Sequence, residues 1–244
     1  MITGGSAPSS RFTSSQFMWS AIWATMAALS FAVMMLSVRY MEGKLDAFEI
    51  VFFRALIGLF MVIPLVSRSG VRALKTTKLP LHIVRTLFAL FAMATLYYAL
   101  AVMPVAQAIA LTFLIPLFTT MAAGLVLRES VGIHRWSATL VGFAGAMVII
   151  RPGILEISVP VIFVVLSSAL YAGAWSSVKI LTRTDSPAIT VFWMNVMMVP
   201  LTAIPVAFLW VTPDWSDAPP LLIMAVTGWS AHFCQARAFE KSDA

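Results

Sequence analysis

The stretch ATLYYALAVMPVAQAIAL (residues 94–111) indicates the fold class, because it carries no charged residue and Pro104 alone divides its apolar run. The apolar residues continue on both sides for about 20 residues, the length with which an α-helix crosses a bilayer core about 30 Å thick. Pro104 is therefore expected in a very short turn between two membrane-spanning helices, the third and fourth of the chain.

The rest of the chain has the same apolar character. Of its 244 residues, 61% are hydrophobic and only 11% are charged, whereas a soluble domain carries about 25% charged residues. The chain is therefore predicted to be an integral membrane protein. Its single cysteine, Cys234, excludes an intramolecular disulfide and a cysteine-based metal site. No basic run is interleaved with aromatic residues, so nucleic acid is not an expected partner.

Eight stretches are long and apolar enough to span a membrane: approximately 17–38, 48–66, 82–103, 105–127, 136–151, 157–180, 188–211 and 219–239. The predicted fold is therefore an all-α polytopic membrane protein. The first span follows a Ser/Gly-rich tail, residues 1–16, and is longer than the apolar core of a signal peptide, so we expect it to be retained.

Lys and Arg are distributed unevenly between the two sets of loops. The tail and the even-numbered loops hold twelve of them, and the odd-numbered loops hold three. Because cytoplasmic loops are enriched in basic residues, both ends of this sequence are expected in the cytoplasm, on a cytoplasmic (inner) membrane protein. The same bias accounts for the net charge of +6, which therefore does not indicate an acidic partner.

The chain also resembles itself. Four matches carry the comparison: Leu29-Ser30 with Leu166-Ser167, Val38-Arg39 with Val178-Lys179, Pro64 with Pro205, and LYYALAVMPVAQA (96–108) with HFCQARAFEKSDA (232–244). The first unit has five spans, an odd number, so a second copy would be inserted upside down, as in many transporters. The fourth and fifth spans of the first unit have no counterpart after the eighth span. We therefore expect the chain to lack two spans.

Residues 85–153 resemble a known family. They comprise an arginine that opens the third span, the stretch ATLYYALAVMPVAQAIAL, then LIPLF, LVLRES and a Gly-rich fifth span that ends in VIIRPG. This pattern is similar to the EamA-type branch of the drug/metabolite transporter superfamily, and the similarity covers nearly the whole chain from about residue 20.

The resemblance implies ten spans in two inverted five-helix repeats, with a central cavity that opens alternately to each side of the membrane. It implies transport of amino-acid-like, nucleotide-cofactor-like or vitamin-like metabolites, or of drugs. On this basis residues 1–16 are the tail, 17–153 the first repeat and 157–244 an incomplete second repeat of three helices.

Arg54 is the first candidate for substrate binding, because it lies within the span VFFRALIGLF (51–60). An arginine at the centre of a membrane helix costs about 2.5–3.5 kcal/mol to insert, so it needs a partner, a cavity or a route to the interface. Either it binds an anionic group along the transport pathway, or it snorkels outward from its place one to two turns into the helix. Glu49 is only marginally placed to pair with it.

Further candidates are aromatic or carry an amide. They are Tyr97 and Tyr98 in the third span, Gln107 in the fourth, Trp175 in the sixth and Asn195 in the seventh. An apolar cavity with a few orienting hydrogen bonds suits amphipathic organic metabolites. The alternative for Gln107 and Asn195 is a hydrogen bond between helices.

His232 and Gln235 lie three residues apart on the eighth span and therefore share a face. One histidine without a carboxylate or a second histidine is a poor metal site, so no metal is expected. The two are either polar residues of the pathway or, for His232, a buried hydrogen-bonded side chain. No Asp or Glu lies deep in a span. Proton coupling is then absent, or it uses His232 or the two spans that the chain lacks.

Small residues at four-residue spacing predict close helix packing at three places: Ala24, Ala28 and Ala32; Ala138, Gly142 and Ala146; and Ser168, Ala172 and Ser176. Pro116 is expected to bend the fourth span and to free backbone carbonyls for a cavity.

The leading interpretation is a metabolite transporter with no catalytic residue and no cofactor. A membrane-embedded enzyme would need a juxtaposed nucleophile and base or a His/Asp cluster, and three histidines without paired carboxylates do not indicate one. The alternative is a truncated or partner-requiring membrane protein without transport activity of its own. The expected partners are a small-molecule substrate and the lipid bilayer, and a homo-oligomer is left open.

Overall fold

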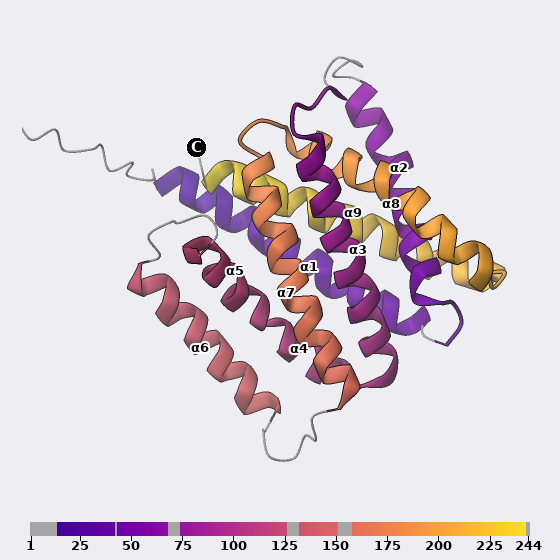
Figure 1. The fold of residues 1–244 in the computed structure, drawn as a ribbon, viewed down its shortest axis with the longest axis horizontal. Helices are drawn as coiled ribbons and strands as arrows, with labels where there is room; N and C mark the ends of the chain where they lie inside the picture. The colour runs from indigo at the N-terminus through magenta and orange to yellow at the C-terminus, as the bar shows by residue number, and fades with distance from the viewer. Residues whose placement is uncertain (1–13, 42, 68–73, 126–131, 151–157, 243–244) are drawn as a thin grey trace, which may run out of the picture.

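A computed structural model of the chain describes residues 14–41, 43–67, 74–125, 132–150 and 158–242 (Figure 1). Long helices account for most of them. The elements are α1 (Ser14–Met41), α2 (Ala47–Ser67), α3 (Leu79–Val102), α4 (Val105–Thr112), α5 (Leu114–Leu125), α6 (Ile133–Ile150), α7 (Val159–Leu181), α8 (Pro187–Leu209), the short 3₁₀ helix η2 (Trp215–Asp217) and α9 (Ala218–Ser242).

The helices follow from the apolar runs, since a backbone in lipid can satisfy its hydrogen bonds within a helix. Among the described residues, six helical segments are long and apolar enough to cross a membrane: α1, α2, α3, α4 with α5, α7 and α8. The other two predicted spans are also helical, as α6 and α9, but they are not among the six. The predicted all-α polytopic membrane fold is confirmed.

Short turns connect several of these helices, and local residue types explain them. Gly43 adopts φ +74° between α1 and α2, a left-handed conformation that glycine reaches without steric cost. Ser186 precedes α8, and its hydroxyl accepts a hydrogen bond from the Ile189 backbone N–H at 3.4 Å. Pro187 then occupies the first position of α8, where a missing N–H costs nothing.

The fourth predicted span is broken in two. Helix α4 ends at Thr112, Phe113 forms a turn, and α5 begins at Leu114. Pro116 has no N–H to donate to the carbonyl of Thr112, so the regular hydrogen-bond ladder cannot continue through this point. The break at Phe113 agrees with the bend expected from Pro116.

The two halves of the chain pack against each other in a reciprocal pattern. Helix α1 lies along α9, α3 lies along α7, and α2 packs against α8, as Figure 1 shows. Suppose that α7, α8 and α9 repeat α1, α2 and α3. The α1–α9 contact is then equivalent to the α3–α7 contact, and the α2–α8 contact pairs each helix with its own counterpart, on the symmetry axis. The inverted repeat itself stays a prediction. Helices α5 and α6 lie at one edge of the bundle (Figure 1).

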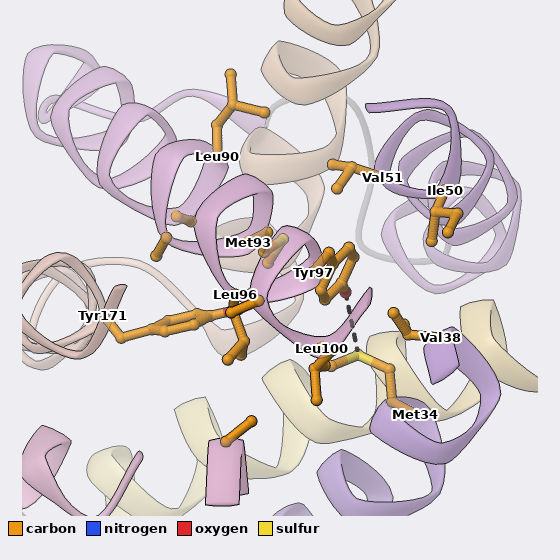
Figure 2. Close-up of a cluster of buried hydrophobic side chains, with 14 of the residues drawn as sticks. Met34, Val38, Ile50, Val51, Leu90, Met93, Leu96, Tyr97, Leu100 and Tyr171 are labelled. Carbon is orange, nitrogen blue, oxygen red and sulfur yellow. Dashed lines mark hydrogen bonds between the residues drawn. The ribbon is translucent and has the colours of Figure 1, made fainter. Parts of the chain in front are cut away.

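The core lies where these pairs meet (Figure 2). Buried side chains of α1, α2, α3, α7 and α8 form one apolar cluster, with Met34, Met93, Leu96, Tyr97 and Met198 among its members. The methionines fill irregular gaps between helices, because their unbranched side chains adapt to their surroundings. The cluster fixes the helices that carry the predicted site residues.

Candidate functional site

A cleft runs between α1 on one side and α4 and α5 on the other. Its two parts have volumes of about 420 Å³ and 350 Å³, and they share Ala28, Phe31, Pro116 and Trp175 in their walls. We call the two parts together the α1–α5 cleft. Volumes of this size are typical of sites for small organic ligands.

Aromatic side chains form one wall of the cleft. Phe31 and Trp175 line both parts, and Tyr171 lines the larger one. The ring of Trp175 lies 6.3 Å from that of Phe31 and 6.1 Å from that of Tyr171, measured between centroids. Trp175 therefore lies between two aromatic neighbours, within the distances at which rings interact favourably.

The break between α4 and α5 contributes the opposite wall. Thr112, Phe113 and Pro116 all line the larger part of the cleft. Because residue 116 is a proline, the Thr112 carbonyl has no N–H donor four residues later. The expectation that Pro116 shapes a cavity agrees with this arrangement.

Polar groups of α7 and α9 lie at the same wall. Gln235 lines the smaller part of the cleft, and His232 contacts Phe31 edge to face, with a distance of 5.3 Å between ring centroids. The indole Nε1 of Trp175 and the Nε2 of His232 are buried and have no hydrogen-bond partner among the described residues. A buried donor without a partner is costly. Trp175 lines both parts of the cleft, so its indole is suited to bind a polar ligand group, whereas His232 lines neither part and lies behind Phe31.

Arg54 is not at the surface of the bundle. Its side chain is 1% exposed, and Nη2 lies 3.2 Å from the Met93 sulfur and 3.0 Å from that of Met198. The interpretation that Arg54 snorkels outward is therefore wrong, because α2 turns this face toward α3 and α8. Its Nε has no hydrogen-bond partner among the described residues. Glu49 instead accepts the backbone N–H of Val211 at 3.3 Å.

Asn195 lies at the contact between α8 and α2, where its amide packs against Gly58. A β-carbon at Gly58 would lie 3.2 Å from the Asn195 Nδ2 atom, a tight contact that would require the amide to shift by a few tenths of an ångström. Nδ2 has no hydrogen-bond partner among the described residues. Asn195 is therefore buried between helices, but its amide donates no described hydrogen bond that would join them.

Tyr97, Tyr98 and Gln107 lie away from the α1–α5 cleft. Both tyrosines line a smaller cavity of about 160 Å³ beside the α1–α2 turn. Tyr97 is buried, and its hydroxyl lies 3.9 Å from the Met34 sulfur, whereas Tyr98 is exposed and packs on Phe163 (Figure 2 shows the Tyr97 contact). Gln107 is half-buried and lines neither cavity. The structure thus brings Trp175 and Gln235 to the cleft, with His232 behind Phe31, and places the other five candidates elsewhere.

The sequence predicts that the small residues of α1 pack against another helix, but they do not. Ala24, Ala28 and Ala32 are exposed and line the α1–α5 cleft. In α6, a β-carbon at Gly142 would meet nothing within 4 Å. Only the α7 group, Ser168, Ala172 and Ser176, is packed as expected. Small side chains in α1 widen a cavity instead.

Two ties hold the loops at opposite ends of the bundle. At one end, Lys44 Nζ donates to Asp217 Oδ1 at 2.9 Å, and this hydrogen bond raises the pKa of Lys44 and lowers the pKa of Asp217. At the other end, His82 and Asp185 form a buried pair. Sequence reasoning missed both pairs, because their members are more than 100 residues apart.

No group of three or more His, Cys, Asp or Glu residues that could hold a metal ion occurs in the described part of the chain. The site is thus aromatic and apolar, with a few buried polar atoms. Such a surface can bind and orient an organic molecule.

Comparison with known proteins agrees with this geometry. The EamA-like transporter family matches residues 18–151. The chain belongs to the EamA-like transporter family. It is a multi-pass membrane transporter of small organic metabolites, and the predicted resemblance is confirmed.

Named relatives extend over most of the chain. The riboflavin transporter of Vibrio cholerae is 31% identical over 229 residues, which cover 92% of this chain and 77% of the relative. The S-adenosylmethionine uptake transporter of Rickettsia prowazekii is 29% identical over 207 residues, covering 84% and 70%. The pseudopaline exporter of Pseudomonas aeruginosa is 30% identical over 195 residues, covering 80% and 66%.

A solved crystal structure shares the fold of this transporter. It superimposes with a TM-score of 0.65 at 17% identity, covering 92% of this chain and 78% of the other. A likeness at this level of identity shows the fold alone.

Proposed function

We propose that the transporter carries a small metabolite with a planar heteroaromatic ring, and that the ring binds in the α1–α5 cleft against Phe31 and Trp175. The observation that carries the proposal is the aromatic wall of the cleft, where Trp175 lies between Phe31 and Tyr171. Flat rings stack on such side chains, and base–aromatic stacking contributes about 1–3 kcal/mol per ring.

The polar atoms around the wall supply orientation. We keep His232, which lies behind Phe31, as a supporting residue of this wall. Gln235 adds an amide to the smaller part, and Trp175, which lines both parts, has a buried Nε1 without a described partner. These groups can bond to the ring nitrogens and carbonyl oxygens that heteroaromatic metabolites carry. Riboflavin and S-adenosylmethionine, which two relatives are named for, both contain such a ring.

We assign the other predicted site residues to later steps of the transport cycle. Arg54 and Asn195 lie at the contacts of α2 with α3 and α8, and we assign them to the surface exposed when the halves separate in alternating access. Tyr97 and Tyr98 line the cavity beside the α1–α2 turn, which we assign as the opposite mouth of the pathway. Gln107 stays a candidate on α4.

The excess of Lys and Arg in the tail and even-numbered loops supports an amino terminus in the cytoplasm of an inner-membrane protein. The reciprocal packing of α1 on α9 and α3 on α7 supports repeat units of residues 17–153 and 157–244. The relatives are named as transporters, which supports transport without catalysis and without a nucleic-acid partner. A homo-oligomer stays open.

Uptake by proteoliposomes tests the proposal, with labelled riboflavin and S-adenosylmethionine as the two test substrates. Trp175→Ala should slow uptake of the transported compound by about 5- to 150-fold, as loss of 1–3 kcal/mol of stacking implies. The matched control is Trp215→Ala, because Trp215 is 94% exposed and lies outside the cleft. Equal rates for the two variants and the wild type would refute the assignment of the cleft.

A further inference from the structure

A buried histidine–aspartate pair lies at one end of the bundle. The distribution of Lys and Arg assigns this end to the cytoplasm. His82 lies in the first turn of α3, and Asp185 lies in the turn between α7 and α8; Figure 1 shows this turn beside the start of α3. His82 Nε2 lies 2.7 Å from Asp185 Oδ2, with His82 fully buried and Asp185 8% exposed. The pair joins the first half of the chain to the second.

Three further hydrogen bonds join the same two segments. Asp185 Oδ2 also accepts the Thr76 hydroxyl at 2.7 Å. Arg85 Nη1 donates to the Thr190 carbonyl at 2.7 Å, and Trp193 Nε1 donates to the Leu74 carbonyl at 3.1 Å. This end is therefore closed by polar contacts that must break if the two halves separate here.

The equivalent positions at the opposite end of the bundle are apolar. Asp185 lies two residues before the start of α8, and Leu45 lies two residues before the start of α2. His82 lies three residues after the start of α3, and Leu221 lies three residues after the start of α9. Leu45 and Leu221 are 8% and 6% exposed and belong to one buried apolar cluster. The polar tie at that end is instead the Lys44–Asp217 ion pair, which contains no histidine, so the two ends are held by groups that titrate in different pH ranges.

One atom of the pair is left without a partner. His82 Nδ1 is buried and makes no hydrogen bond within the described residues. Asp185 Oδ2 accepts a hydrogen bond from the Thr76 hydroxyl and lies opposite His82 Nε2. A neutral His82 ring therefore carries its proton on Nε2, where it can donate to the carboxylate. Nδ1 is the position that would take up a second proton.

Protonation of Nδ1 would make the closed arrangement less favourable. The new N–H would be a buried donor without an acceptor, and the ring would become a cation removed from water. Arg85, one turn along α3, adds further positive charge, whereas the Asp185 carboxylate opposes the effect. The charged groups of the adjoining segments and of the end of α7 are Lys75, Lys78, Lys179 and Arg183, all positive. Opening this end would hydrate the imidazolium.

We propose that His82 and Asp185 form a proton-binding latch, which holds this end of the transporter closed while His82 is neutral and opens when Nδ1 takes up a proton from the adjoining aqueous phase. The proton comes from water and returns to it when the latch closes, so each opening binds one proton and each closing releases it. The proposal rests on alternating access as part of the proposed function. It identifies a titratable group for a transporter whose spans carry no deeply placed carboxylate.

The first test needs no substrate. The chain has three histidines, so nitrogen-15 spectra of labelled histidine in lipid nanodiscs can follow each ring. His82 should change from neutral to charged as the pH is lowered through the range in which histidines titrate in proteins. Over the same range, hydrogen exchange of the segments around residues 74–86 and 182–192 should accelerate, by up to about tenfold per pH unit after correction for intrinsic exchange.

Two variants make the test specific. His82→Leu combined with Asp185→Leu copies Leu45 and Leu221, so it should remain folded and lose the pH dependence of exchange in both segments. Asp185→Asn keeps the shape of the side chain but removes the charge that favours the imidazolium, so the pH of opening should fall. A His82 ring that stays neutral throughout, or exchange that depends on pH equally in the double-leucine variant, would overturn the proposal.

Uptake measurements then relate the latch to transport. Wild-type uptake of riboflavin or S-adenosylmethionine should depend on pH at this face, and uptake by the double-leucine variant should not. If neither compound is transported, the substrate assignment fails while the spectra and exchange data still decide the latch. If uptake occurs but is equally pH-dependent in both proteins, the latch fails and the substrate assignment stands.

Discussion

The close approach of α9 to α1 and α2 at Gly228 gives a quantitative test of the packing around Arg54. A β-carbon at Gly228 would lie 3.1 Å from the Met34 sulfur and 3.2 Å from Cδ of Arg54. Both neighbours are almost fully buried, at 0% and 1% exposure, so neither can move aside freely. Gly228→Ala should therefore overpack this contact, at a cost of about 1–3 kcal/mol.

Gly142 in α6 is the matched control, because a β-carbon there would meet nothing within 4 Å. Replacing a helical glycine by alanine gains about 0.8–1.0 kcal/mol at either position, so this gain cancels between the two variants. The difference that remains is the overpacking cost. For a chain of this size, 2 kcal/mol corresponds to a separation of about 4–8 °C between the melting temperatures.

Melting temperatures in one detergent, read by intrinsic fluorescence, measure this separation. Gly142→Ala should melt at or above the wild-type temperature, and Gly228→Ala should melt below it. If Gly228→Ala is as stable as Gly142→Ala, α9 does not approach α1 and α2 as closely as the structure indicates, and the buried position of Arg54 would have to be revised.

Three further predictions concern single side chains. Arg54→Met should leave the protein as stable or more stable by about 1–3 kcal/mol, because it removes a buried donor without a described partner, but it should slow uptake; loss of folding would contradict this. Trp175→Phe keeps an aromatic ring in the cleft but removes the indole N–H, so its uptake rate should lie between those of the wild type and Trp175→Ala. The lowered pKa of Asp217 means that its bond to Lys44 stabilises the fold above the ordinary Asp pKa of about 3.9 and is lost as pH falls through the lowered value. Asp217→Asn should therefore lower the melting temperature near pH 7 and have less effect near pH 3, as thermal melts at the two pH values would show.

Much of the fold can be predicted from the sequence, because lipid imposes a simple rule. A backbone that crosses a bilayer must be helical, so each long apolar run marks a helix, and Pro116 marks the point where one of them breaks. The direction in which a side chain points around its helix is not determined by this rule. Arg54 lies near one end of α2, which allowed snorkelling, and only the packing of α2 against α8 and α9 shows that it points inward.

Only part of the candidate site could be predicted, because the sequence does not show which side chains face a cavity. Trp175, His232 and Gln235 are polar or aromatic residues within spans, and the structure places Trp175 and Gln235 at the cleft with His232 behind Phe31. Phe31 was missed, because a phenylalanine in an apolar helix carries no distinguishing signal. Ala24, Ala28 and Ala32 were assigned to a helix contact, since a row of small residues leaves the same pattern whether a helix or a cavity lies opposite.

The His82–Asp185 pair shows how an internal repeat can reveal chemistry that motifs do not. Neither residue stands out alone, because each lies near a helix end where polar residues are ordinary. Aligned by the starts of their helices, however, they take the places of Leu221 and Leu45. The tie at the opposite end is the Lys44–Asp217 ion pair, so the two ends are held by different titratable groups. In a transporter that opens alternately at each end, such a difference would let the two ends respond to different ranges of pH.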